Sequence, residues 1–222
     1  MRVIVFGATG MLGSGILREC LLDDGVERVL VIARSSTGTT HPKLQEVVQK
    51  DLFQIGELDS ALDGYDVCLY ALGVTSVGAS EEEYTKLTLD LTKVIAGTLL
   101  QHNPQMKFLF ISGRGADSSG TSAVMWARVK GAAENAVLAM GFADAYVFRP
   151  GVIQGLHGSG PKVKWIRVTY TILSPLFPVI RWLAPNAICT TVELGRAMLN
   201  VARRGYPKKI LENKEFRDAA KD

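Results

Sequence analysis

Short apolar runs alternate with longer segments whose apolar residues recur at helical spacing along most of the chain. The runs predict six strands, at Arg2–Phe6, Arg28–Ala33, Leu44–Val48, Asp66–Ala71, Lys107–Ser112 and Ala145–Phe148. The helical spacing predicts helices over Gly13–Leu22, Leu58–Leu62, Glu81–His102, Ser122–Met140 and Val192–Arg203. Strands that alternate with helices form βαβ units, so we expect an α/β fold with a doubly wound parallel sheet covered on both faces.

The regular alternation of predicted strands and helices ends after Gly151. We expect one domain over residues 1–222, with residues 155–190 forming a small lid or substrate-side region within it. Residues 165–183 are largely apolar and approach the length that spans a bilayer, but two internal prolines and two arginines argue against a span. A lid over a pocket, or an amphipathic segment in peripheral contact with a membrane, fits this stretch better.

Composition is that of a globular protein, with 47% hydrophobic and 21% charged residues. The three cysteines, Cys20, Cys68 and Cys189, are scattered without metal-ligand spacing, which favours free, reduced and mostly buried thiols and no metal site. Glycines break the apolar N-terminus and no small-residue cleavage site follows, so we interpret it as a core strand and not a signal peptide. From the reduced cysteines we expect a cytoplasmic protein.

Charge is unevenly distributed beneath a formal net charge of +3. Residues 1–154 carry 13 Lys and Arg against 17 Asp and Glu, whereas residues 155–222 carry 12 against 5. A basic C-terminal third suits an anionic ligand or a membrane surface. No recognisable nucleic-acid-binding motif accompanies it, so we expect no nucleic-acid partner.

The most informative motif is the glycine turn after the first strand. Gly7, Gly10 and Gly13 are spaced by three residues between a buried strand and a helix. We expect Gly7 to permit the tight turn, Gly10 to let a pyrophosphate approach the backbone, and Gly13 to let the helix pack on the sheet. With Thr9, Met11 and Leu12 they predict a dinucleotide site at the helix N-terminus, in a Rossmann-type fold.

The end of the second strand predicts which dinucleotide binds. An acidic residue there bonds the ribose 2′-hydroxyl of NAD, but here Arg34 follows the strand, Ser35 comes next, and no acidic residue lies nearby. A guanidinium can grip a 2′-phosphate, so we expect NADP(H). Asp51 and Leu52 follow the third strand, where side chains border the adenine. Ala71, Leu72 and Gly73 end the fourth strand, where small residues let the backbone approach the cofactor.

Several stretches together resemble the short-chain dehydrogenase/reductase superfamily in its atypical, NAD(P)H-binding branch. The nearest likeness is to the epimerase-like bacterial relatives of the Tat-interacting-protein oxidoreductases. Beside the glycine turn and Ile32–Arg34, the matching stretches are Phe110–Asp117, Val129–Glu134, Phe148–Gly151 and Leu194–Met198. The likeness spans the chain, and it adds Arg149, Pro150 and Gly151 to the expected cofactor site.

The resemblance also implies a catalytic Tyr four residues before a Lys, with a Ser upstream. The Lys binds the nicotinamide ribose and lowers the pKa of the Tyr, which passes a proton as hydride moves. Lys130 is present, but Trp126 stands at the Tyr position, and an indole does not titrate usefully. Ser112 matches the region of the catalytic Ser, although Ser118, Ser119 and Thr121 could also fill that role.

The sequence leaves the proton donor and the activity open. Another tyrosine could replace the phenol: Tyr84 opens the preceding helix, and Tyr146, Tyr170 and Tyr206 follow this one; His157 is a further alternative. We expect an NADP(H)-dependent oxidoreductase with a modified active site and an unknown small-molecule substrate. The alternative is a non-catalytic module that senses or binds NADPH. A nucleotide-sugar epimerase or dehydratase is disfavoured because those enzymes need the Tyr.

Overall fold

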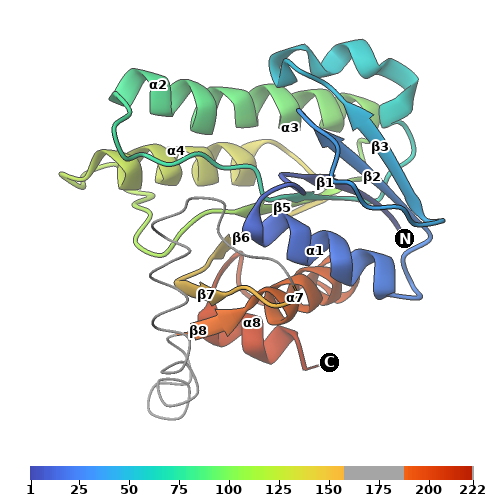
Figure 1. The fold of residues 1–222 in the computed structure, drawn as a ribbon. Helices are drawn as coiled ribbons and strands as arrows, with labels where there is room; N and C mark the ends of the chain where they lie inside the picture. Colours follow the sequence, from blue (N-terminus) through green and yellow to red (C-terminus); the bar gives the residue numbers. More distant parts are fainter. Residues whose placement is uncertain (158–187, 222) are drawn as a thin grey trace.

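The computed structural model describes residues 1–157 and 188–221, and among these the chain builds a seven-stranded parallel sheet (Figure 1). The strand order is β3-β2-β1-β4-β5-β6-β9, so β1 lies between β2 and β4, and the order of the strands along the chain reverses between β1 and β4. The strands are β1 (Arg2–Phe6), β2 (Arg28–Ala33), β3 (Leu44–Val48), β4 (Val67–Tyr70), β5 (Lys107–Ile111), β6 (Asp144–Arg149) and β9 (Ile210–Glu212).

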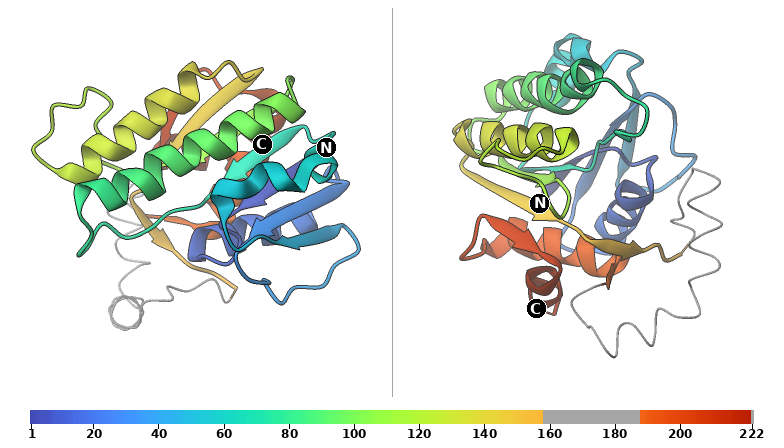
Figure 2. Two further views of the ribbon diagram at one scale, coloured as in Figure 1. Left: turned by 90° about the horizontal axis from the view of Figure 1, so that it is seen from above. Right: turned by 90° about the vertical axis from the view of Figure 1, so that its left-hand side faces the viewer.

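Helices cover both faces of this sheet. One face carries α1 (Met11–Leu22) and α7 (Thr191–Arg204), with α8 (Asn213–Ala219) packed on α7. The other carries η1 (Leu52–Leu62), α3 (Leu91–His102) and α4 (Met125–Ala139). Figure 2 shows α3 and α4 side by side over the sheet, and α7 and α8 on the opposite side. The predicted Rossmann-type architecture is therefore confirmed.

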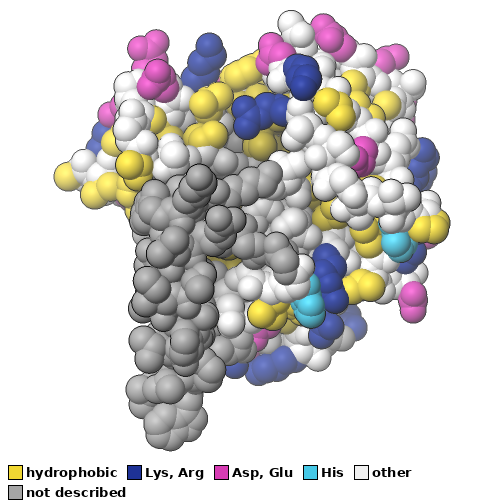
Figure 3. All heavy atoms as spheres, in the orientation of Figure 1, with side chains coloured by type: hydrophobic (Ala, Val, Ile, Leu, Met, Phe, Trp, Pro, Cys, Tyr) yellow, Lys and Arg dark blue, Asp and Glu magenta, His cyan; other side chains and the backbone are white. Residues whose placement is uncertain are grey.

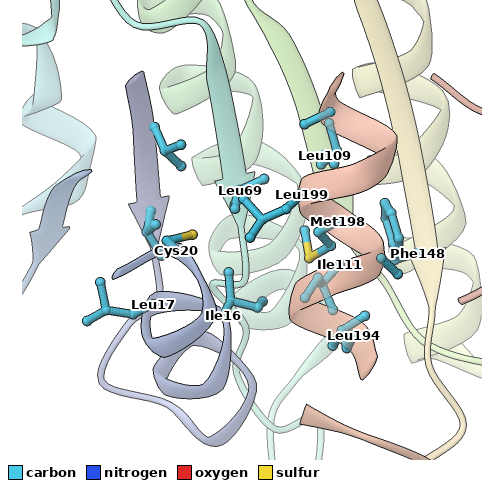
Figure 4. Close-up of a cluster of buried hydrophobic side chains, with 14 of the residues drawn as sticks. Ile16, Leu17, Cys20, Leu69, Leu109, Ile111, Phe148, Leu194, Met198 and Leu199 are labelled. Atoms are coloured by element: carbon cyan, nitrogen blue, oxygen red, sulfur yellow. The ribbon is translucent and has the colours of Figure 1, made fainter. Parts of the chain in front are cut away.

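Each face has its own apolar layer, because the strands are buried on both sides and alternate side chains point opposite ways. Figure 4 shows the layer beneath α1 and α7: Ile16, Leu17 and Cys20 of α1 face Leu194, Met198 and Leu199 of α7 over β4, β5 and β6. The three cysteines are buried and free, as the sequence predicted.

The helix predicted over Glu81–His102 has an extra feature. It consists of α2 (Glu81–Thr85), a π-helical turn η2 (Lys86–Asp90) and α3. A π turn inserts one residue and so rotates the helix before the turn relative to the helix after it. Leu91 and Ile95 are buried, whereas Leu87 and Val94, which share the predicted apolar spacing, are exposed.

The C-terminal part contains strands that the apolar pattern did not predict. β7 (Val152–Gln154) pairs in parallel with β8 (Ile188–Thr190) in a separate two-stranded sheet, and β9 extends the main sheet beyond β6. The predicted lid at 155–190 lies mostly outside the described residues, and the apolar stretch 165–183 lies wholly outside them.

The glycine turn holds β1, α1 and the end of β4 together by backbone contact. Gly7 has φ +78°, and a Cβ built on it would lie 2.4 Å from the carbonyl oxygen of Ala71. A Cβ on Gly13 would lie 2.1 Å from the carbonyl oxygen of Gly7. Gly13 thus lets α1 approach the glycine turn itself, whereas we expected it to let the helix pack on the sheet. Any side chain at these two positions would push α1 away from the sheet.

We therefore predict that Gly13→Ala lowers the free energy of unfolding by about 1–3 kcal/mol, the usual effect of overpacking a tight contact. Urea denaturation followed by circular dichroism measures it. Gly97→Ala is the matched control, because Gly97 lies within α3 with no atom within 4 Å of the added Cβ. That change should stabilise the protein by about 0.5–1 kcal/mol. Equal stabilities for the two variants would contradict the backbone contact.

Candidate functional site

The glycine turn presents an uncapped helix N-terminus at the carboxyl end of β1. Gly10 is the N-cap of α1 and offers no side-chain acceptor, and the first turn holds no acidic residue. The N–H groups of Met11, Leu12 and Gly13 have no acceptor within the helix, because the first turn of any α-helix leaves its donors open. A Cβ on Gly10 would meet only the Gly7 carbonyl oxygen, at 3.2 Å. The turn with Thr9 at its centre can therefore receive an anion.

The end of β4 lies beside this turn. Ala71 and Leu72 touch Gly7 through their backbone, as the strand pairing of β1 with β4 requires. On the other side, a Cβ on Gly73 would lie 4.0 Å from the Nζ of Lys130. The structure thus brings Gly7, Ala71, Gly73 and Lys130 to one edge of the sheet, at the point where the strand order reverses.

Arg34 lies at the end of β2, on the same edge. Its side chain is exposed, and no ion pair or hydrogen bond holds the guanidinium within the described part of the chain. Ser35 beside it is exposed as well. The cation is available for a ligand.

The structure corrects the expectation that no acidic residue lies near this loop. Glu46 of β3 accepts hydrogen bonds from the Ser36 hydroxyl at 2.6 Å and from the Thr37 N–H at 3.0 Å. The parallel pairing of β2 with β3 brings Glu46 there, twelve residues away from Arg34 in sequence. These hydrogen bonds lower the pKa of Glu46, although burial opposes them more strongly than any single bond. Glu46 therefore anchors the loop that follows Arg34 as an ionised carboxylate.

Asp51 and Leu52 have local structural roles. The Asp51 carboxylate accepts from the Phe53 N–H at 3.0 Å and so caps η1, while the Leu52 side chain is buried in the core layer under α3. Their predicted position beside an adenine stays a prediction.

Ser112 and the amine of Lys130 both lie at the carboxyl end of β5. Ser112 is 8% exposed, and its Oγ has no hydrogen-bond partner in the described residues. The Lys130 Nζ donates weakly to the carbonyl oxygen of Ile111, at 3.4 Å, and lies 5.3 Å from the centre of the Phe110 ring. Removal from water lowers the pKa of Lys130 to about 8, against the opposing effect of the Glu134 carboxylate one turn further along α4.

The other hydroxyls that the sequence offered for the Ser role are engaged. Ser118 Oγ donates to Glu134 and accepts from Arg149, and Ser119 Oγ donates to Asp117. Thr121 shares a hydrogen bond with Ser119. Of these four residues, Ser112 alone keeps an unpaired hydroxyl in the described structure.

Trp126 lies in the first turn of α4, half-buried against the loop that follows Ser112. Its ring lies 4.0 Å from a Cβ built on Gly113 and 3.4 Å from one built on Gly115. Two glycines thus leave the space in which the indole packs. The ring fixes the loop between Ser112 and Ala116 and brings no titratable group to the site.

Four of the described tyrosines have phenols that ionise less easily than usual. Burial raises the pKa of Tyr65, Tyr70, Tyr84 and Tyr146. Tyr70 bonds Thr92 in the core, and Tyr146 donates to Asp144 and accepts from the Tyr206 N–H. His157 is exposed with φ +54°, just before the undescribed segment that contains Tyr170.

The Arg149–Gly151 stretch serves the framework of the site. The Arg149 guanidinium pairs with Glu134, whose side chain is fully buried, and its Nη2 also donates to Ser118 at 2.7 Å. The Pro150 carbonyl accepts from the Arg114 N–H, and the Gly151 N–H donates to Asn213 of α8. The stretch that we expected to bind cofactor thus joins α4, α8 and the loop after Ser112, and Arg149 has a protein carboxylate as its partner.

Charged side chains of both signs stand on the face shown in Figure 3. Acidic side chains lie along the upper edge together with Lys and Arg, and the first turn of α2 holds Glu81, Glu82 and Glu83. Lys and Arg gather along the lower edge, below α1. Across residues 1–157 and 188–221, no three His, Cys, Asp or Glu side chains come together as metal ligands. Within these same ranges no helix is long and apolar enough to cross a membrane.

Comparison with known proteins supports the family that the sequence motifs indicated. Residues 3–122 match the model of the NAD dependent epimerase/dehydratase family. The protein fmp52, mitochondrial, of Emericella nidulans is 31% identical over 161 residues, which cover 69% of this chain and 67% of the relative. The protein HTATIP2 of Rattus norvegicus is 28% identical over 224 residues, 99% of this chain and 89% of the relative.

Solved structures agree in fold. The dTDP-glucose 4,6-dehydratase DesIV of Streptomyces venezuelae, with NAD and TYD bound, superposes with a TM-score of 0.68 at 18% identity, over 99% of this chain and 80% of that one. Pal of Bacillus thuringiensis superposes with a TM-score of 0.71 at 14% identity, over 100% of this chain and 83% of that one.

One expectation is corrected by these comparisons. The expected cytoplasmic location is contradicted by the fmp52 relatives of Emericella nidulans and Meyerozyma guilliermondii, which are named as mitochondrial proteins. The cysteines and the N-terminus were too weak a basis for deciding a compartment, because reduced thiols occur in more than one of them.

The buried Glu134–Arg149 pair yields a stability prediction. Arg149→Met leaves the Glu134 carboxylate buried without its cation, so we expect the free energy of unfolding to fall by about 3–5 kcal/mol. Arg128→Met is the control, because Arg128 pairs with the exposed Glu81 and its loss should cost at most about 1 kcal/mol. Both are measured by urea denaturation, and similar losses in the two variants would contradict a framework role for Arg149.

Proposed function

The chain belongs to the NAD dependent epimerase/dehydratase family, and from this premise we propose that it is an NADP(H)-dependent oxidoreductase acting on a small carbonyl or alcohol substrate. The observation that carries the proposal is that the buried Ser112 hydroxyl and the Lys130 amine both lie at the carboxyl end of β5. Buried polar groups in proteins almost always have a hydrogen-bond partner. A buried hydroxyl that has no partner among the described residues, next in sequence to the Ile111 carbonyl that the Lys130 amine contacts, is suited to a ligand that supplies the missing acceptor or donor.

The residues present fit a nicotinamide dinucleotide. The open N–H groups of Met11, Leu12 and Gly13 would hold the pyrophosphate, and the bare backbone at Gly10 would let it approach. Ala71, Leu72 and Gly73 would border the cofactor, with Lys130 at the nicotinamide ribose. When bound, the cofactor supplies or accepts a hydride. The protein orients it and places Ser112 where a substrate oxygen can be bound.

Arg34 supports NADP(H) over NAD(H). Its guanidinium is exposed at the end of β2 without a protein partner in the described chain, as a group that pairs with a 2′-phosphate must be. Ser35 can add a hydroxyl contact. Glu46 is bound to Ser36 and Thr37, so its carboxylate is held by the loop.

A second function has one specific observation in its favour. Trp126 occupies the Tyr position and is packed against Gly113 and Gly115, so the usual proton donor is absent. A module that binds NADPH and turns nothing over would need no such donor. Stopped-flow and steady-state assays of NADPH oxidation over a panel of aldehydes and ketones separate the two. Turnover of any carbonyl compound supports the oxidoreductase, and tight NADPH binding with no turnover supports the binding module.

Arg34 provides the test of cofactor choice. We predict that wild type binds NADPH more tightly than NADH, and that Arg34→Ala weakens NADPH binding by about 1.5–3 kcal/mol, the value of a charge-assisted hydrogen bond, while leaving NADH binding unchanged. Isothermal calorimetry measures both. Arg28→Ala is the control, because Arg28 lies at the opposite end of β2 and bonds Gln45. Equal affinity of the wild type for the two cofactors would refute the assignment.

Gly10 provides the test of the pyrophosphate site. We predict that Gly10→Val abolishes dinucleotide binding and leaves the fold intact, since the added side chain fills the space over the helix N-terminus and meets little protein. Thermal unfolding and calorimetric titration check the two parts. A folded variant with wild-type affinity would show that the cofactor binds elsewhere.

A further inference from the structure

We propose that Lys130 is itself the proton-transferring residue of this site, in place of the phenol that Trp126 replaces. The proposal rests on the oxidoreductase function above and names the residue that completes its chemistry. It is based on three observations: the position of the Lys130 amine, its lack of a carboxylate partner among residues 1–157 and 188–221, and the engagement of other groups near it.

The Lys130 Nζ lies across the edge of the sheet from the glycine turn. It contacts the end of β5 through the carbonyl oxygen of Ile111, the residue before Ser112, and it approaches Gly73 at the end of β4. The one hydrogen bond that the described residues give this amine is long, at 3.4 Å, which leaves its other N–H donors open for a ligand. A substrate oxygen bound by the unpaired Ser112 hydroxyl would therefore have the amine as its neighbour.

Within the described part of the chain, Lys130 also has no carboxylate that neutralises its charge. Glu134 lies one turn along the same helix, but Arg149 and Ser118 take its two carboxylate oxygens. On the elements packed against α4, Glu81 of α2 binds Arg128, and the Asp117 carboxylate accepts from Ser119 and Ser122. Lys86 of η2 lies over the Phe53 ring. The negative charge of Glu134 therefore affects Lys130 only electrostatically, and Glu134 is not its hydrogen-bond partner.

Other proton donors are missing from the described residues around Lys130. The indole of Trp126 does not titrate, and the phenols of Tyr70 and Tyr146 are hydrogen-bonded within the framework. Tyr84 is 3% exposed, and burial raises its pKa. The pKa of Lys130, lowered to about 8, is by contrast close to the pH at which a general acid works best.

A proton from Lys130 balances the transfer of hydride. In the reductive direction the carbonyl carbon accepts a hydride from the reduced cofactor while the carbonyl oxygen takes a proton from the Lys130 ammonium. The products are the alcohol, the oxidised cofactor and a neutral amine, which regains its proton from water. Reduction therefore needs the ammonium, so kcat should be constant below the pKa and fall tenfold per pH unit above about pH 8. Oxidation of the alcohol needs the amine and should show the opposite dependence.

The first test measures the pKa of the Lys130 amine and does not depend on catalytic turnover. In the cofactor-free protein, competitive acetylation with acetic anhydride followed by mass spectrometry gives the pH at which each lysine becomes reactive. Lys130 is expected to titrate at about 8. Lys208 is the internal reference, because its hydrogen bond to Glu215 raises its pKa above the ordinary value. A Lys130 midpoint at the ordinary lysine value overturns the proposal.

The second test uses Lys130→Arg, which keeps the positive charge and hydrogen-bond donors but cannot release a proton near neutral pH. NADPH should still bind, while kcat falls by about 10²–10⁴-fold and the pH dependence near 8 disappears. A Lys130→Arg enzyme with wild-type kcat and an unchanged pH profile overturns the role of Lys130 but leaves the oxidoreductase standing. A wild type that binds NADPH and reduces no carbonyl compound overturns the oxidoreductase, and the role of Lys130 with it.

Discussion

The cofactor side of this molecule depends on a contact between backbones that have no side chains between them. Gly13 of α1 rests on the Gly7 carbonyl, and Gly7 rests on the Ala71 peptide at the end of β4. This contact fixes the first turn of α1 at the carboxyl ends of β1 and β4, where the strand order reverses. The open donors of that turn, the cation of Arg34 and the amine of Lys130 share one edge of the sheet as a consequence, because parallel strands end at the same side.

A second constraint holds the reacting half of the site. Glu134 is fully buried, and its charge requires Arg149 of β6 and the Ser118 hydroxyl. A Cβ on Gly131 would lie 1.8 Å from the Asp117 carbonyl oxygen, so the loop after β5 is pressed against α4 on the same side. The pair thereby fixes the helix that carries Lys130 and the loop that follows Ser112. It also occupies the one carboxylate in the described chain that could otherwise neutralise Lys130.

The sequence predicted the βαβ order, the glycine turn and several strand bounds because these are local patterns with strong physical causes. It did not predict β7, β8 and β9, which are three residues long and carry too few side chains for an apolar period. It also missed partners that only the fold brings together: Glu46 reaches Ser36 from a neighbouring strand, and Arg149 finds Glu134 across the helix–sheet interface. The sequence did hold one signal of a buried charge here: Glu134 follows Lys130 by four residues, on a helix face that otherwise carries Ala and Val.

The presence of Trp126 at the position of the catalytic Tyr is not an isolated difference, because the residues around Trp126 leave a space that fits its indole. Its indole fills the space that Gly113 and Gly115 leave open in the loop that follows Ser112. The absence of the phenol also changes the electrostatics: an anionic tyrosinate would have stabilised the Lys130 ammonium, whereas an indole leaves burial as the main effect on its pKa. Replacing the phenol by a neutral, bulky ring therefore moves the amine towards the pH range in which it can exchange a proton. The same substitution that removes one acid–base group from the helix thus favours the other, one turn away on the same face.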